Sequence, residues 1–146
     1  MDIPYNIVCT GNTAIHKIEC TPPEIKKYFT ENNINLINTS QGYSKCSTLI
    51  VNDKSIITSD NSIHKIAIAN GIDSLLITPG FIDLPGYDYG FIGGASGQFN
   101  NTIMLTGKID QHPDCNLITN FIKNKGMDIS FLSENSAKDI GSILII

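Results

Sequence analysis

Three short apolar runs end in threonines, Thr10, Thr58 and Thr106, at a fixed offset of 48 residues along this chain. Each run is followed by a stretch of helical character and then by a second apolar run, at residues 34–38, 74–77 and 129–132. A period in this size range indicates one supersecondary unit that is copied several times. The pattern therefore predicts about three repeats of 48 residues in a chain of 146 residues.

The middle copy shows the repeated unit most clearly. Residues 47–58 form two apolar, β-branched runs around Asn52-Asp53, which predicts a hairpin with a tight turn. A helix should follow, capped by Asp60 or one of the two polar residues after it, and closed by Asn70-Gly71. Residues 73–77 then make the last strand, so the predicted unit is β-β-α-β.

The third copy follows the same plan. Its turn is expected at residues 99–102, and its helix at Pro113, because the first helical position tolerates proline. Gly126 should end that helix before a strand at residues 128–132. The helix face that points to the core is marked by an apolar stripe: Leu117, Ile118, Phe121 and Ile122.

The first and last copies are predicted to be incomplete. The first copy is expected to begin at its second strand, residues 5–9, because no strand precedes it. Its helix should start with a capping box at residues 21–24 and turn Ile25, Tyr28 and Phe29 toward the core. The last copy is expected to end after a single strand at residues 141–146.

The predicted organisation is a single domain, residues 1–146, of three units at about 5–41, 42–89 and 90–146 with incomplete ends. Strand edges without partners attract other chains. Either the two ends pair with each other, or a neighbouring subunit or a missing amino-terminal portion supplies the partner. A homo-oligomer or a longer chain is therefore expected.

Composition narrows the function classes. The net charge of −4 and the absence of Lys/Arg clusters argue against a nucleic-acid partner. No apolar stretch approaches the ~20 residues that cross a bilayer, and the amino terminus lacks the features of a signal peptide, so we expect no membrane partner and a cytoplasmic protein. The four cysteines show no CxxC spacing, which predicts free thiols, no metal and no cofactor. Abundant Ile, Asn and Lys suggest an AT-rich bacterial genome.

Three strings carry a family resemblance: residues 41–47 (QGYSKCS), 84–94 (LPGYDYGFIGG) and 139–143 (DIGSI). They resemble an uncharacterised clostridial family assigned to the guanidino-group-modifying enzyme fold, or pentein fold. Repeated ββαβ units are similar to the five-bladed α/β propeller of arginine deiminases, agmatine deiminases and dimethylarginine hydrolases. The ribosome anti-association factor of archaea and eukaryotes shares that architecture without being an enzyme. The resemblance implies an α/β (α+β) propeller, of which this chain would hold the last three of five blades.

Cys46 is the first candidate site residue. Counting back from the turns aligns it with Gly94 and, more loosely, with Gly141. The enzymes it resembles use a cysteine nucleophile that attacks a guanidinium carbon, in a Gly-rich segment ending in Cys and a strand, and residues 41–49 are similar to that pattern. A thiolate needs a nearby cation or dipole; Lys45 is adjacent, although consecutive strand residues point to opposite faces. The alternative is a small buried residue that fills space.

His112 and Asp114 form the second candidate. The resemblance implies a His-x-Asp motif, in which the histidine protonates the leaving amine and the carboxylate holds the guanidinium by a two-pronged contact. A histidine titrates near neutrality, which suits proton transfer. The alternative is an ordinary helix start, where a proline and an aspartate are common.

Three further carboxylates are candidates for substrate binding. Asp139 precedes Gly141 and could face the same channel as Cys46. Asp60 could equally cap its helix. Asp88 lies in a loop rich in Pro, Gly and Tyr, which could line a pocket or form an ordinary turn.

Two functions stay open. The first is a cysteine-dependent hydrolase or transferase acting on a small guanidine or amidine, with Cys46 as nucleophile, His112 as acid/base, and Asp114 or Asp139 on the substrate. The second is a non-catalytic binding or assembly module of the same fold, completed by oligomerisation or by a partner chain.

Overall fold

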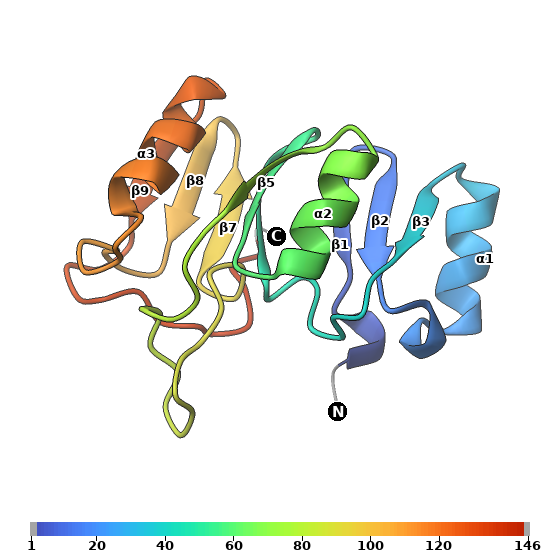
Figure 1. Cartoon of the computed structure of the whole chain (residues 1–146), viewed down its shortest axis with the longest axis horizontal. Helices are drawn as coiled ribbons and strands as arrows, with labels where there is room; N and C mark the ends of the chain where they lie inside the picture. The colour runs from blue at the N-terminus through green and yellow to red at the C-terminus, as the bar shows by residue number, and fades with distance from the viewer. Residues whose placement is uncertain (1–2, 145–146) are drawn as a thin grey trace.

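The computed structural model describes residues 3–144, which form three small three-stranded sheets and three α-helices. Figure 1 shows the sheets side by side, with α1 and α3 at the two ends and α2 between them. Bounds of the elements are, in chain order, η1 Ile3–Tyr5, β1 Val8–Thr10, β2 Thr13–His16, η2 Ile18–Cys20, α1 Pro23–Glu31, β3 Asn35–Asn38, β4 Thr48–Asn52, β5 Ser55–Thr58, α2 Asn61–Ala69, β6 Asp73–Leu76, β7 Ser96–Phe99, β8 Thr102–Leu105, α3 Cys115–Asn124 and β9 Asp128–Phe131.

Each sheet has the same topology. Two strands form an antiparallel hairpin, a helix crosses over, and the last strand pairs in parallel with the middle one, in the orders β1-β2-β3, β4-β5-β6 and β7-β8-β9. A parallel pair needs such a crossover because its strands run the same way. The mixed α/β class expected from the sequence is confirmed. None of the helices in the described part of the chain has the length and apolar character of a membrane-spanning segment.

The first unit differs from the prediction. The run that ends at Thr10 is the first strand of a complete hairpin, since β1 pairs with β2 and Thr10 lies opposite Thr13. Gly11-Asn12 makes a two-residue turn, and Gly11 takes the positive φ of +54° that such a turn requires. Thr10 therefore does not correspond to Thr58, which ends a second strand, and the offset of 48 residues is not constant.

The helix starts also differ from the prediction at two places. Thr21 does not cap α1; Pro22 occupies the N-cap position without a side-chain bond, and Thr21 Oγ1 lies 2.6 Å from His16 Nδ1. Pro113 precedes α3, whose N-cap is Asp114. Asp60 does cap α2, by accepting a 2.9 Å bond from the Ile63 N–H. Of the residues expected to face the core from α1, Phe29 is buried but Tyr28 is exposed.

The carboxy-terminal segment forms no strand within residues 141–144, and residues 145–146 of the predicted strand lie outside the described part. The segment instead runs beside the start of β7. Ile140 N donates to Gly94 O at 3.1 Å, and Ile143 N donates to Ser96 O at 3.0 Å. The expectation that this segment lacks a partner is therefore wrong for the described residues.

Two apolar cores lie between neighbouring units. Val8 and Ile15 of the first unit pack with Ile56 and Ile63 of the second. A larger core joins the second and third units through Leu49, Val51, Ile57, Ile103, Leu105, Ile118 and Ile122. Because Ile56 and Ile57 point to opposite faces of β5, that strand contributes to both cores.

A buried histidine lies at the end of β2. His16 is 0% exposed, and its Nε2 lies 2.9 Å from the Ile3 carbonyl oxygen. Burial lowers the pKa of His16 from its ordinary value of 6.5, although bonds to the Ile3 and Gly42 backbone act in the opposite direction. The neutral ring therefore fits the folded state better than the imidazolium.

We expect the free energy of unfolding to fall as pH is lowered below the ordinary histidine pKa of 6.5. In the window between that value and the lower folded-state pKa of His16, the unfolded chain binds a proton that the folded chain does not. Denaturant unfolding at about pH 7.5 and about pH 5 measures this slope. His16→Gln should be less stable at both values but show a shallower slope, and an unchanged slope would contradict the assignment.

Candidate functional site

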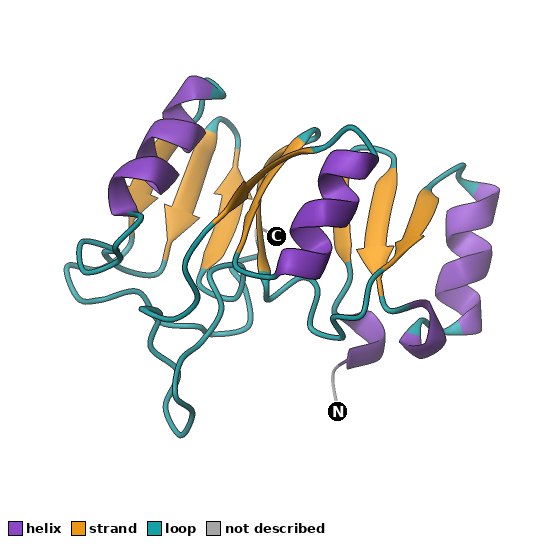
Figure 2. Cartoon of the chain, viewed as in Figure 1, coloured by secondary structure: helices purple, strands orange, loops and turns teal. Residues whose placement is uncertain are grey.

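Three loops that lie far apart in the sequence meet at the same edge of the sheets: residues 41–47, 90–95 and 139–143. Figure 2 shows the loops, in teal, gathered below the strands. Gly94 N donates to Cys46 O at 2.9 Å, and Ile140 N donates to Gly94 O at 3.1 Å, so a short hydrogen-bonded series connects the loops. Cys46 and Gly94 thus occupy equivalent places, whereas the third place is taken by Ile140 and not by Gly141.

Glycines allow these loops to approach so closely. A Cβ at Gly93 would overlap the carbonyl oxygens of Thr48 and Lys45, and a Cβ at Gly94 would overlap the Asp139 carboxylate. Both glycines are buried. Gly93 therefore allows two backbone segments to approach closely, and Gly94 leaves room for the Asp139 side chain.

Asn6 forms two hydrogen bonds with Cys46. Its Oδ1 accepts a 3.0 Å bond from Cys46 N, and its Nδ2 donates to Cys46 Sγ at 3.0 Å. Sγ also lies 3.9 Å from the carbonyl oxygen of Gly141. Cys46 is only 9% exposed, yet it belongs to neither apolar core. The thiol is therefore buried in a polar environment, with an amide donor aimed at the sulfur.

Lys45 brings a positive charge to the same loops. Its ammonium donates to Gly93 O at 3.2 Å and to Ser142 Oγ at 3.1 Å. Burial lowers the pKa of Lys45, and its electrostatic interactions with Cys46 and Asp139 oppose that shift. The backbone between Lys45 and Cys46 thus places an ammonium and a thiol on adjoining residues.

Asp139 anchors the third loop. Its Oδ2 accepts a 2.9 Å bond from Phe91 N, and its Oδ1 accepts a 3.0 Å bond from Gly141 N. A carboxylate offers about four lone-pair sites, so two backbone donors leave it able to accept further bonds. Asp139 is half-buried and stands close enough to Lys45 to affect its charge.

His112 and Asp114 form a separate cluster. Asp114 N donates to His112 Nδ1 at 3.0 Å, and Asp114 Oδ2 accepts a 2.6 Å bond from Thr78 N. The His112 ring lies 5.4 Å from the Phe81 ring, and its buried Nε2 has no hydrogen-bond partner among residues 3–144. None of these described interactions involves Cys46. The pair fastens the loop after β6 to the turn before α3.

The charges of this second cluster follow from its geometry. Burial lowers the pKa of His112, although the Asp114 carboxylate and the Thr78 backbone oppose that shift. Bonds from Thr78 lower the pKa of Asp114. At neutral pH the cluster therefore holds a neutral imidazole beside an ionised carboxylate.

The remaining predicted carboxylates lie apart from the sulfur. Asp60 uses Oδ1 to cap α2 and accepts a 3.1 Å bond from Gln41 Nε2 with Oδ2, so it supports the loop that leads to Cys46. Asp88 is exposed in the loop between β6 and β7, which projects from the molecule in Figure 1. Within residues 3–144, no three His, Cys, Asp or Glu side chains are placed to hold one metal ion.

Two contributors were missed by sequence reasoning. Asn6 lies 40 residues before Cys46, and Ser142 lies 97 residues after Lys45. Neither belongs to a spacing pattern that points to a thiol or an ammonium. Only the arrangement of the loops in space brings them to the site.

Comparison with known proteins supports the fold. The sequence matches the model of a family described as "Family of unknown function (DUF6873)" over residues 1–144. No curated protein matches the sequence. The structure is similar to C. jejuni agmatine deiminase with a TM-score of 0.59 and 8% identity, covering 94% of this chain and 55% of that one. This chain therefore spans about half the length of the deiminase. At that identity the likeness shows a pentein-like fold and no specific function.

Gly93→Ala should lower the free energy of unfolding by roughly 1–3 kcal/mol or more, because the two oxygens that its Cβ would meet belong to the backbone and cannot turn away. Gly42→Ala is the matched control. Its Cβ would lie 3.1 Å from Ile3 Cγ2, a side-chain atom that can move. Urea unfolding of both variants gives the comparison, and equal stability of the two would contradict the close approach at Gly93.

Proposed function

This chain belongs to the DUF6873 family, and we propose that it is a cysteine-dependent hydrolase or transferase that acts on small guanidine- or amidine-containing molecules. Cys46 is the proposed nucleophile. The single observation that carries the proposal is the Asn6 amide, which donates to Cys46 Sγ at 3.0 Å beside the Lys45 ammonium.

An amide donor contacts the sulfur, and the neighbouring residue carries a cation. Hydrogen bonding to a charged form stabilises that form, and so does an opposite charge nearby. The thiolate is the nucleophile in cysteine chemistry, since the neutral thiol reacts poorly. A residue that only filled space would have no need of an amide donor aimed at its sulfur.

The fold likeness suggests the class of substrate. The similar protein is named as a deiminase of agmatine, a compound that carries a guanidinium group. In the proposed reaction the Cys46 sulfur forms a bond to the central carbon of a guanidinium or amidinium. His112 takes the Cys46 thiol proton as this bond forms and gives it to the amine as the C–N bond breaks. Water or a second amine then displaces the sulfur, which regains a proton from that nucleophile.

Carboxylates would hold the cationic substrate. Asp139 is the proposed first contact, because it keeps free acceptor sites near Lys45 and Cys46. The other proposed substrate contacts lie in loops at the same edge of the sheets: Asp114, Asp60 and Asp88. His112 stays the proposed acid/base, and its neutral imidazole would need to come within reach of the leaving amine. A reducing bacterial cytoplasm is the proposed setting, since it keeps such a thiol free.

Asn6→Asp should slow alkylation of Cys46 at least about tenfold at neutral pH, because a hydrogen bond to a charged group contributes roughly 1.5–3 kcal/mol. The aspartate keeps an oxygen for Cys46 N but replaces the donor to sulfur with a repelling charge. Mass spectrometry should follow labelling by chloroacetamidine and by iodoacetamide, with Cys20 and Cys115 as internal references. Wild-type Cys46 should prefer chloroacetamidine, whose cation would bind near Asp139.

Ammonia release from a panel of guanidines and amidines measures turnover itself. Cys46→Ser should abolish it without changing the fold. His112→Asn keeps an acceptor for Asp114 N, so lost turnover with normal Cys46 alkylation would support proton transfer by His112. Labelling of Cys46 only after unfolding would contradict the enzyme proposal as a whole.

One observation favours the second function, a non-catalytic module completed by oligomerisation or by a partner chain. Three of the four predicted substrate carboxylates already accept backbone bonds, Asp139 from Phe91, Asp60 from Ile63 and Asp114 from Thr78. They therefore also serve to hold loops in place. Sedimentation at the monomer mass across micromolar concentrations would rule out the oligomeric form of this alternative.

A further inference from the structure

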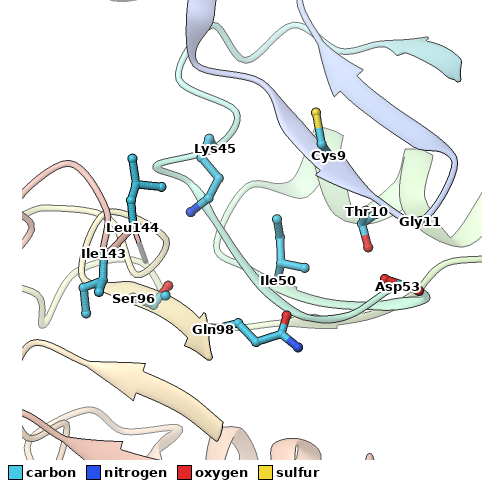
Figure 3. A pocket seen from close by; sticks show the side chains of 11 residues that line it. Cys9, Thr10, Gly11, Lys45, Ile50, Asp53, Ser96, Gln98, Ile143 and Leu144 are labelled. Atoms are coloured by element: carbon cyan, nitrogen blue, oxygen red, sulfur yellow. The ribbon is translucent and has the colours of Figure 1, made fainter. Parts of the chain in front are cut away.

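A cavity of about 320 Å³ lies between the first strands of the three hairpins and the carboxy-terminal segment. Figure 3 shows its lining: Thr10 of β1, Ile50 of β4, Ser96 and Gln98 at β7, and Lys45. Gly97 allows the segment at Ile143 to come close enough to close one wall, since a Cβ there would overlap Ile143 O. The cavity is thus built by the same close packing of backbones that forms the loops.

The cavity carries opposite charges at separate places. Lys45 and Asp53 both line it, and they lie on opposite sides of Ile50 in Figure 3. Neither side chain forms an ion pair with another residue of the described range. Between them the wall is mixed, with the Ile50 side chain and the polar groups of Ser96 and Gln98.

Lys45 is suited to an anion. An ammonium has three N–H donors, and the two partners described for Lys45, Gly93 O and Ser142 Oγ, are neutral. Asp139 affects the charge of Lys45 but forms no ion pair with it among the described residues, and a partly buried ammonium is costly without an opposite charge in contact. A carboxylate in the cavity would supply that charge. A phosphate dianion fits less well, because Asp53 would repel it.

Asp53 is suited to a cation. It lies in the exposed turn between β4 and β5, and its backbone is held against Gly11, where a Cβ would meet Asp53 O at 2.9 Å. The turn is further fixed by Thr10 Oγ1, which donates to Asn52 O at 2.9 Å. The carboxylate of Asp53 is therefore carried on a well-held turn at the edge of the cavity.

The size of the cavity sets the size of its ligand. A volume of about 320 Å³ is roughly ten times the share of one water molecule in the liquid. It falls at the lower end of the range of small-molecule pockets, about 300–1,000 Å³. An amino acid fits such a space.

We propose that this cavity binds a small zwitterion, with Lys45 contacting its carboxylate and Asp53 its ammonium group. The site is distinct from the proposed nucleophile. Cys46 does not line the cavity, and its sulfur faces Asn6 and Gly141 instead. Binding here therefore stands whether or not Cys46 is catalytic.

A two-dimensional NMR titration with a series of ω-amino acids, glycine, 4-aminobutanoate and 6-aminohexanoate, tests this proposal. Each is compared with the acid and the amine of the same chain length, for example butanoate and butylamine. At least one member should bind at least about tenfold more tightly than either half-ligand, since each end adds a charge-assisted bond. The shifted amides should include residues 96–98.

Two variants assign the contacts. Asp53→Asn keeps a residue suited to the turn, and it should remove the preference for the zwitterion over its acid without weakening binding of the acid. Lys45→Met should remove binding of the acid. Lys54→Met is the matched control, because Lys54 lies in the same turn but outside the cavity lining, and it should change neither affinity.

Two outcomes would overturn the proposal. One is that no member of the series binds more tightly than its half-ligands. The other is that Asp53→Asn leaves the preference unchanged. Asp53→Asn decides the matter even where Lys45→Met fails to fold, since Asp53 is exposed and its side chain holds no described element in place.

Discussion

Burial of β5 on both faces is the constraint on which the rest of the structure depends. Ile56 packs into the core shared with the first unit, and the next residue, Ile57, packs into the core shared with the third. Each fully buried isoleucine contributes about 1.5–3 kcal/mol, and no unit has a core of its own that is separate from its neighbours. The three units must therefore fold against one another, and their order in space follows from that packing. Loops that precede the hairpins are brought to one edge as a consequence.

Close packing of backbone segments brings polar and charged side chains together at this edge of the sheets. Gly93 lets two loops meet backbone to backbone, and Gly94 makes room for the Asp139 carboxylate, so polar groups from distant parts of the chain converge. Two consecutive residues, Lys45 and Cys46, then face two different environments. The sulfur of Cys46 lies against Asn6, whereas the ammonium of Lys45 lies at the cavity between the hairpins. A single stretch of backbone thus supplies a thiol to one environment and a cation to another.

Sequence reasoning succeeded where local signals agree with the packing. The helix and last strand of the second unit were predicted correctly, because Asp60 and Asn70-Gly71 mark the ends of α2. Its hairpin was also predicted, but the turn lies at Asp53-Lys54 and not at Asn52-Asp53, since Asn52 pairs with Ser55. Sequence reasoning failed in the first unit, where the spacing of residues along the whole chain was given more weight than a local turn signal. The threonine spacing hid the Gly11-Asn12 turn, although that dipeptide is typical of hairpins. The capping box at residues 21–24 failed because Thr21 bonds to the buried His16. The pairing of Asn6 with Cys46 had no local signal, since it arises only from packing of the first unit on the second.

Lys45 couples the two proposed sites by electrostatics. Lys45 interacts electrostatically with the neighbouring Cys46, and its positive charge would attract a carboxylate into the cavity. A carboxylate bound at Lys45 would neutralise much of the field that the sulfur experiences, so the bound state would hold a less reactive thiol. Coupling between binding sites is reciprocal, so a group that binds at the Cys46 sulfur would change the affinity of the cavity by the same factor. A ligand in the cavity would thus slow the proposed reaction at Cys46, through the Lys45 side chain and without a change of fold.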